Sequence, residues 1–175
     1  MEKVRLLIAE KGGVETIAIE LRDGGLTSRE FDYGVPVEER RYRVSLPGPE
    51  GEPGWEIGDA LVRRRRVRDY RSEVQIQAFL AAGLRPDDRV SSIVTFYPTE
   101  PKEIRNLGVG GRVMREILED CADSAAVHCF PCSAEMVGLL TSKFGFEHFH
   151  EGDFIKLLRT DGPAPTLNRL QRDIE

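Results

Sequence analysis

The sequence predicts an α/β protein built around two parallel strands that a helix connects. Residues 90–97 are rich in β-branched and aromatic side chains, which is typical of a strand. After a glycine-rich turn, apolar residues recur at helical spacing between positions 113 and 121. Residues 125–130 then have the composition of a second strand. A strand, a helix and a strand in this order form a right-handed βαβ unit, whose two strands are parallel.

A glycine-rich turn links the first of these strands to the helix. Glycines give the backbone conformations that a Cβ forbids, and they let N–H groups approach a bound group. The following helix begins with unpaired N–H donors and a partial positive charge, so the turn indicates an anion site, most naturally for a phosphate. A tight turn without a ligand is the competing interpretation. The residues assigned to this site are Arg105, Asn106, Leu107, Gly108, Val109, Gly110, Gly111 and Arg112.

Two common nucleotide-binding motifs do not fit this turn. The dinucleotide fingerprint G-x-G-x-x-G would need a glycine where the chain has Val113. The phosphate-binding P-loop needs a lysine directly after its last glycine, and none follows here. A site for some other phosphate-bearing group is therefore a better interpretation of the turn than either nucleotide-binding motif.

The first half of the chain carries weaker signals. Strands are expected at residues 4–9, 14–21 and 41–46, with a short helix as the alternative for the second of them. Residues 26–40 are polar and are expected to be irregular. Residues 47–54 are rich in Pro and Gly, which predicts a surface loop.

Residues 59–80 are expected to form a helix that is rich in arginine, with one break near Tyr70 as the alternative to a continuous helix. Four of its arginines are consecutive, so on a helix they cannot share one face. The ordinary interpretation is a solvated helix with long amphipathic side chains. The sharper one is a basic patch for an acidic substrate or a nucleic acid.

The C-terminal part indicates a short helix and a hairpin. Ser133 is a candidate N-cap, and Gly145 is expected to end the helix. Residues 146–150 and 154–158 are expected to pair as the two strands of a hairpin. Residues 161–175 are expected to form a tail, which leaves residues 1–160 as a single domain.

Composition narrows the class of protein. The 175 residues suit one domain with a sizeable core, and the net charge of −5 argues against a nucleic-acid binder. No apolar run is long enough to cross a membrane, and the N-terminal apolar run is too short for a secretory signal. Three cysteines do not form a disulfide framework. We expect a cytoplasmic protein and leave its oligomeric state open, a homodimer included.

Two motifs together resemble a known family. Arg105-x-x-Gly108-x-Gly110 matches the (Arg or Gln)-x-x-Gly-x-(Gly or Ala) signature of the GCN5-related N-acetyltransferase superfamily. The stretch from Lys143 to Phe146 corresponds to the K-x-G-F that closes the last helix of that family. The separation of the two motifs and the elements between them also agree, and the resemblance covers about residues 90–159.

The resemblance implies a mixed, twisted sheet with a splayed parallel strand pair, flanked by helices. It implies acetyl-CoA as cosubstrate, with its pyrophosphate on the amides of the glycine turn. Acetyl would pass directly to an amine acceptor whose identity is unknown, while a backbone N–H polarises the thioester oxygen. A non-catalytic acyl-CoA-binding module of the same fold is the first alternative, and a nucleic-acid-associated protein is the second.

The chain departs from the family pattern where catalytic residues are concerned. The family often has a tyrosine as general acid where this chain has Thr141, and a carboxylate as base on the strand at 90–97, which has none. Glu100 and Glu103 follow that strand, but glutamates are mostly surface residues. Ser133 or Ala134 falls where the family often has Asn. The catalytic residues therefore stay unassigned.

The cysteines and histidines do not predict a metal site. Cys129 and Cys132 form a CxxC beside His128, but neighbours on a strand point to opposite faces, which breaks up the cluster. Buried thiols and ordinary histidines are the expected roles. Cys132, at the end of the expected strand, is a candidate acyl-carrying nucleophile, although a plain thiol is the simpler interpretation.

Overall fold

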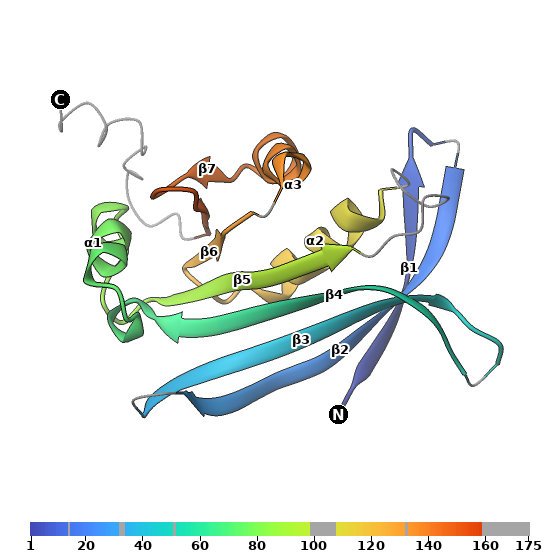
Figure 1. Cartoon of the computed structure of the whole chain (residues 1–175), viewed down its shortest axis with the longest axis horizontal. Coiled ribbons are helices and arrows are strands. Elements are labelled where there is room, and N and C mark those ends of the chain that lie inside the picture. The colour runs from blue at the N-terminus through green and yellow to red at the C-terminus, as the bar shows by residue number, and fades with distance from the viewer. Residues whose placement is uncertain (14, 32–33, 51, 99–107, 132, 159–175) are drawn as a thin grey trace. The chain divides into compact units, whose positions relative to one another are not determined.

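The computed structural model describes residues 1–13, 15–31, 34–50, 52–98, 108–131 and 133–158 (Figure 1). It is a mixed α/β structure whose strands hydrogen-bond in the order β1-β2-β3-β4-β5-β6-β8-β7. The strands are β1 (Lys3–Lys11), β2 (Glu15–Phe31), β3 (Val35–Pro47), β4 (Pro53–Arg66), β5 (Arg89–Pro98), β6 (Ala126–Cys129), β7 (Glu147–His148) and β8 (Phe154–Leu157). The helices are the 3-10 turn Val67–Asp69, α1 (Glu73–Ala81), α2 (Val109–Asp120) and α3 (Ala134–Gly138), which runs on as a π-helical turn, Leu139–Lys143.

The chain divides into two compact units, which are described separately. The first unit comprises Met1–Arg29, Glu38–Val62 and Val94–Asp120. The second comprises Glu30–Val37, Arg63–Ile93 and Cys121–Glu175. The boundary expected at residue 160 lies outside the described residues and stays a prediction.

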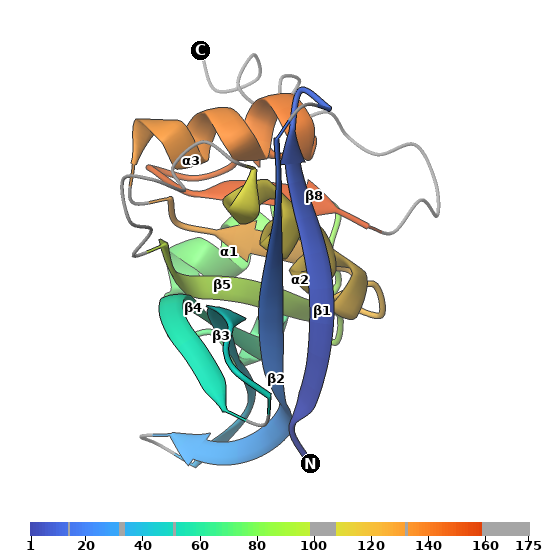
Figure 2. The ribbon, with the colours of Figure 1, turned by 90° about the vertical axis from the view of Figure 1, so that its right-hand side faces the viewer.

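The first unit packs α2 against an antiparallel hairpin. β1 and β2 pair along their length, with Leu7 opposite Ile19, and both of these side chains are buried. α2 contacts β1, as Figure 2 shows, and its apolar face buries Met114 and Ile117 completely. The helical spacing of the apolar residues thus places one stripe of α2 in the core.

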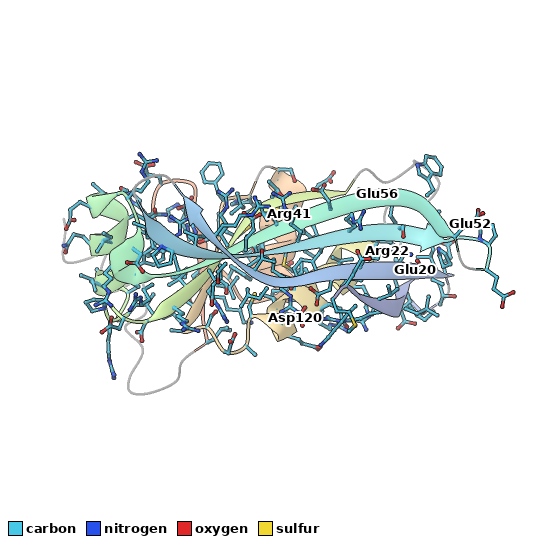
Figure 3. The ribbon with its side chains drawn as sticks, turned by 90° about the horizontal axis from the view of Figure 1, so that it is seen from below. Glu20, Arg22, Arg41, Glu52, Glu56 and Asp120 are labelled. Carbon is cyan, nitrogen blue, oxygen red and sulfur yellow. The ribbon has the colours of Figure 1, made fainter. Side chains whose placement is uncertain are left out.

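An ion cluster fixes the far end of α2 in the same unit. Asp23 on β2 is fully buried and accepts hydrogen bonds from Arg5 Nη2 at 2.9 Å and from Arg40 Nε at 2.8 Å. Arg5 also donates to Asp120, at the C-terminal end of α2, and the Tyr42 hydroxyl donates to the same carboxylate at 2.9 Å. Figure 3 labels Asp120 there. Three strands and a helix are thereby tied together by groups whose burial requires that they be paired.

The second unit contains the parallel pair that the sequence predicts. β5 and β6 pair in parallel from Val90 with Ala126 to Ile93 with Cys129. β8 pairs antiparallel with β6 on one side and with β7 on the other, so the C-terminal hairpin is confirmed. A core cluster covers one face of these strands, formed by Val67, Tyr70, Phe79, Leu84, Val90, Ala126 and Ile155.

Two predictions for the first half of the chain are wrong. The helix expected at 59–80 is wrong in its arginine-rich first part, because β4 runs to Arg66, and it is confirmed in its second part, where α1 begins at Glu73. The arginines of the first part meet carboxylates: Arg64 on β4 pairs with Asp123, and Arg68 in the 3-10 turn pairs with Asp87. The polar segment at 26–40 is not irregular either, because β2 extends to Phe31 and β3 begins at Val35.

The other elements agree with the sequence. The strands expected at 4–9 and 41–46 lie within β1 and β3, and the strand expected at 14–21 lies within β2 from Glu15 on, while residue 14 is outside the described residues. The middle of the Pro- and Gly-rich stretch separates β3, which ends at Pro47, from β4, which begins at Pro53. The helix expected after the glycine turn is α2. Among the described residues, no helix combines the length and the hydropathy that a membrane crossing would require.

Candidate functional site

The N-terminus of α2 follows the glycine turn directly. Gly108 has φ +78°, a left-handed conformation, and its carbonyl accepts the first helical hydrogen bond, from the N–H of Arg112 at 3.0 Å. The N–H groups of the residues between them have no acceptor within the helix, so they are the donors available to an anion. Arg105, Asn106 and Leu107, also assigned to this site, lie outside the described residues.

The glycines of the turn differ in what they permit. A Cβ on Gly108 would come within 2.7 Å of the Glu10 carbonyl oxygen, so this glycine is required by both its φ and its surroundings. Gly110 does not have a positive φ, and a Cβ there would meet the Phe96 ring at an ordinary 3.8 Å. The expectation that Gly110 needs a special backbone conformation is therefore wrong, whereas space beside the helix N-terminus remains a reason for it.

Arg112 is engaged by a carboxylate of its own helix. Its Nη1 donates to Glu116 Oε1 at 2.6 Å, and Arg5 donates to the other oxygen at 3.0 Å. Burial alone would raise the pKa of the Glu116 carboxyl, but the two arginines outweigh it and hold the pKa below its usual 4.5. The charge of Arg112 is thus partly neutralised, which leaves the backbone amides as the main anion donors of the described turn.

The second motif closes the helix that begins at α3. Ser133 caps its start by accepting a hydrogen bond from the Met136 N–H at 3.1 Å. At its end Gly145 has φ +69°, and the Phe146 N–H reaches back to the Leu140 carbonyl at 3.0 Å. These are the bonds of a glycine C-cap, so the glycine of K-x-G-F has a structural role here.

Thr141, at the position expected for a general acid, does not supply one. The Thr141 hydroxyl donates to the Val137 carbonyl of its own helix at 2.8 Å. β5 carries no carboxylate between Val90 and Pro98, and Glu100 and Glu103 lie outside the described residues. The described residues therefore supply neither the usual acid nor the usual base at those two positions.

No metal centre is present among the described residues: nowhere in them do three or more His, Cys, Asp or Glu side chains gather around one point. Cys121 and Cys129 are buried thiols outside any disulfide, as the sequence indicates. Cys132 lies outside the described residues, so its suggested role as a nucleophile stays a hypothesis.

A polar chain that the sequence did not predict crosses one face of the second unit. Tyr70 Oη lies 2.6 Å from Ser92 Oγ, which lies 3.1 Å from His128 Nδ1. His128 Nε2 lies 2.6 Å from Asp153 Oδ2. Ser92 and His128 are opposite each other in the parallel register, so their side chains share a face. The sequence indicates an ordinary histidine at position 128, because the register that pairs His128 with Ser92 cannot be read from the residues alone.

Among the comparisons with known proteins, only the one with solved structures finds similar proteins. No protein-family model matches the chain, and no curated protein matches it. Among solved structures, the chain is similar to Arabidopsis thaliana NAA60 in complex with a bisubstrate analogue. The sequence identity is 12% and the TM-score is 0.49, over 68% of this chain and 75% of that chain.

Proposed function

We propose that the protein is an acyl-CoA-dependent N-acyltransferase that transfers acetyl from acetyl-CoA to an amine. The observation that carries the proposal is the coincidence of two motifs with their expected elements. The R-x-x-G-x-G stretch leads from β5 into α2 with its first glycine at positive φ, and K-x-G-F ends the helix that follows β6. β5 and β6 are parallel, as the family resemblance implies.

In this proposal the turn binds the pyrophosphate of acetyl-CoA. The backbone N–H groups at the start of α2 donate to the phosphate oxygens, and the helix dipole favours the negative charge. Arg105 adds a cation beside the turn, while Arg112 contributes less because Glu116 holds it. The amine, in its neutral form, attacks the thioester carbonyl and displaces the thiolate of coenzyme A, and the carbonyl oxygen takes up negative charge that a backbone N–H stabilises.

A non-catalytic acyl-CoA-binding module is the second candidate. The hydroxyl of Thr141 is used within its own helix, and β5 has no carboxylate, so the two usual proton-transfer groups are missing. The nucleic-acid alternative loses support, because Arg64 and Arg68 already pair with Asp123 and Asp87. These ion pairs lower the positive electrostatic potential that would attract the phosphates of a nucleic acid.

Isothermal calorimetry of the Gly110→Val variant with coenzyme A tests the binding site. The valine lies in the first turn of α2, where it obstructs the approach of a phosphate. We expect the fold to be retained, because an added Cβ at this position makes an ordinary contact with the Phe96 ring at 3.8 Å. We expect at least ~10-fold weaker binding, which corresponds to about 1.4 kcal/mol. Arg105→Ala is expected to weaken binding less.

Gly138→Val is the matched control, because Gly138 is also helical and an added Cβ there meets nothing within 4 Å. Dephospho-coenzyme A, which keeps the pyrophosphate but lacks the 3′-phosphate, should lose affinity by the same factor in Gly110→Val. If Gly110→Val stays folded and binds coenzyme A as tightly as the parent, the turn is not the pyrophosphate site.

Release of free thiol from acetyl-CoA separates the enzyme from the binding module. Turnover with any amine of a panel that includes spermidine, tyramine and peptides with free N-termini would exclude a purely binding role. Binding of acetyl-CoA without turnover on any of them would favour the module.

A further inference from the structure

The hydrogen bonds of the polar chain have one consistent direction. The Asp153 carboxylate can only accept, so His128 Nε2 carries the N–H that points to it. The Nδ1 of the neutral ring is then an acceptor, which makes Ser92 its donor. The Ser92 oxygen accepts in turn from the Tyr70 hydroxyl. Burial raises the pKa of Tyr70 to about 12, although its hydrogen bond with Ser92 and the charge of Arg65 act in the opposite direction, so the phenol keeps its proton at neutral pH.

The chain lies at the carboxyl end of the parallel strand pair. The register pair that follows Ser92 and His128, Ile93 with Cys129, is the last one between β5 and β6. Ligands of parallel sheets bind at the carboxyl ends of the strands. Ser92 is partly exposed, whereas His128 is only 7% exposed and the Asp153 side chain 13%. His128 is thus the buried member of this chain, and it lies between the partly exposed residues Ser92 and Asp153.

We propose that Ser92, His128 and Asp153 form the proton relay that accepts the proton lost by the amine during acyl transfer. The proposal rests on the proposed function. As the amine nitrogen bonds to the carbonyl carbon and the C–S bond breaks, an N–H proton passes to Ser92 Oγ, and the proton of Ser92 passes to His128 Nδ1. The imidazolium forms beside the Asp153 carboxylate, which stabilises its charge. It later loses the proton to solvent, from which the departed thiolate takes up one proton.

The surrounding groups act as positioning residues. Tyr70 holds the Ser92 oxygen by donating to it, and Arg65 lies over the Tyr70 ring at 5.0 Å. The rings of Phe79 and Phe149 stand edge-on to the imidazole, at centroid distances of 5.6 and 6.0 Å, which restrains its rotation. The ionisable groups of this network include Asp153, which contacts the imidazole directly, Tyr70, which reaches it through Ser92, and Arg65, which lies against Tyr70.

Thiol release from acetyl-CoA across the amine panel, measured on the full chain, tests the relay. We expect Ser92→Ala and His128→Gln each to lower kcat by about 100-fold or more, because general acid–base catalysis contributes 10²–10⁴-fold. Calorimetry should give both variants the parent's affinity for acetyl-CoA. Ser92→Thr, which keeps a hydroxyl on a β-branched side chain, should restore most of the activity. Ser91→Ala is the matched control, because Ser91 faces the opposite side of β5 and bonds to Ser124.

A second measurement does not depend on turnover. Long-range ¹H–¹⁵N spectra of the histidine ring in the parent protein should show the Nε2–H tautomer for His128, and Asp153→Asn should disturb it. A third measurement does use turnover: Asp153→Asn should remove the curvature of the solvent-isotope proton inventory of kcat, which a purely structural role would not change.

Four results would overturn the relay. One is an Nδ1–H tautomer in the parent, and another is a Ser92→Ala variant whose kcat stays within about two-fold of that of Ser91→Ala. The third is a Ser92→Thr variant as inactive as the alanine variant. The fourth is a parent that binds acetyl-CoA but acetylates nothing, which would leave the coenzyme A site intact. A parent that does not bind acetyl-CoA would instead refute the proposed function, and the relay with it.

Discussion

Alanine at Gly108 and at Gly110 should change stability in opposite directions. Gly108 has φ +78°, and a residue with a side chain in the left-handed region is destabilised by roughly 1–2 kcal/mol. The new Cβ would also lie 2.7 Å from the Glu10 carbonyl oxygen, a backbone atom that moves only if β1 moves with it. We expect Gly108→Ala to lower the free energy of unfolding by about 2–3 kcal/mol in total, the range for strained backbone sites.

Gly110 lies within the first turn of α2 and lacks both constraints. A Cβ there makes an ordinary contact with the Phe96 ring at 3.8 Å, and alanine favours a helix over glycine by up to about 1 kcal/mol. We therefore expect Gly110→Ala to raise the free energy of unfolding slightly or leave it unchanged. The two substitutions add the same methyl group two residues apart, so each is the control for the other.

Urea unfolding followed by circular dichroism measures both effects. The denaturation midpoint should fall clearly for Gly108→Ala and stay level or rise for Gly110→Ala, at an unchanged slope. Equal midpoints for the two variants would show that the turn does not approach β1 as described. The assignment of Gly108 to a backbone role would then be wrong.

Three further predictions concern stability. Asp23→Asn should lower the free energy of unfolding by about 3–5 kcal/mol in urea, since it leaves Arg5 and Arg40 beside a neutral group in a buried site; a loss below 1 kcal/mol would contradict the cluster. Burial would raise the pKa of Asp23, but Arg40, Gly25 and Arg5 lower it below its usual 3.8, so its stabilisation is complete above that value and lost as pH falls further. Acid titration of unfolding should therefore be steeper below pH 4 in the parent than in Asp23→Asn, and equal slopes would argue against this. Ser133→Ala should cost about 1 kcal/mol through the lost N-cap, measured by urea unfolding against Ser142→Ala, whose serine bonds within the helix rather than at its cap.

The sequence predicts the second half of the fold well because its signals there are local. The apolar stripe of α2, the Ser133 cap and the glycine C-cap at Gly145 each depend on residues within one or two turns. These local patterns predict the same element whichever other part of the chain packs against it. The order of strand, turn, helix, strand, helix and hairpin follows directly from them.

The predictions for the first half of the chain are wrong where pairing between strands overrides the conformation that the local residues favour. β4 holds Ala60, Leu61 and Val62 all buried, so the alternation that marks a strand is absent, and alanine, leucine and arginine favour a helix in isolation. In β3, Glu39 is buried and pairs with Arg29 and Arg41. Because this inward-facing position carries a charged residue, the sequence there suggests an exposed segment instead of a strand. The hydrogen-bonded neighbours of these strands decide their conformation, and they lie outside any local window.

The residues of the candidate site show the same difference between local and long-range signals. The turn proposed to bind an anion is a contiguous stretch, so the eight neighbouring residues 105–112 suffice to identify it. The relay draws on Tyr70, Ser92, His128 and Asp153, which β-sheet register brings together from four separate segments. Nothing in the residues around any one of them marks it as a member.

The buried ion cluster of the first unit also has a consequence for heating. The hydration of charged groups becomes less favourable as temperature rises, so the desolvation penalty of Asp23, Arg5 and Arg40 falls while their mutual attraction remains. Apolar contacts such as those of Met114 and Ile117 gain no comparable advantage per unit area. The contacts between α2 and the strands thus include ionic ones that keep their stabilising effect as the temperature rises. This part of the unit should therefore be among the last to unfold on warming.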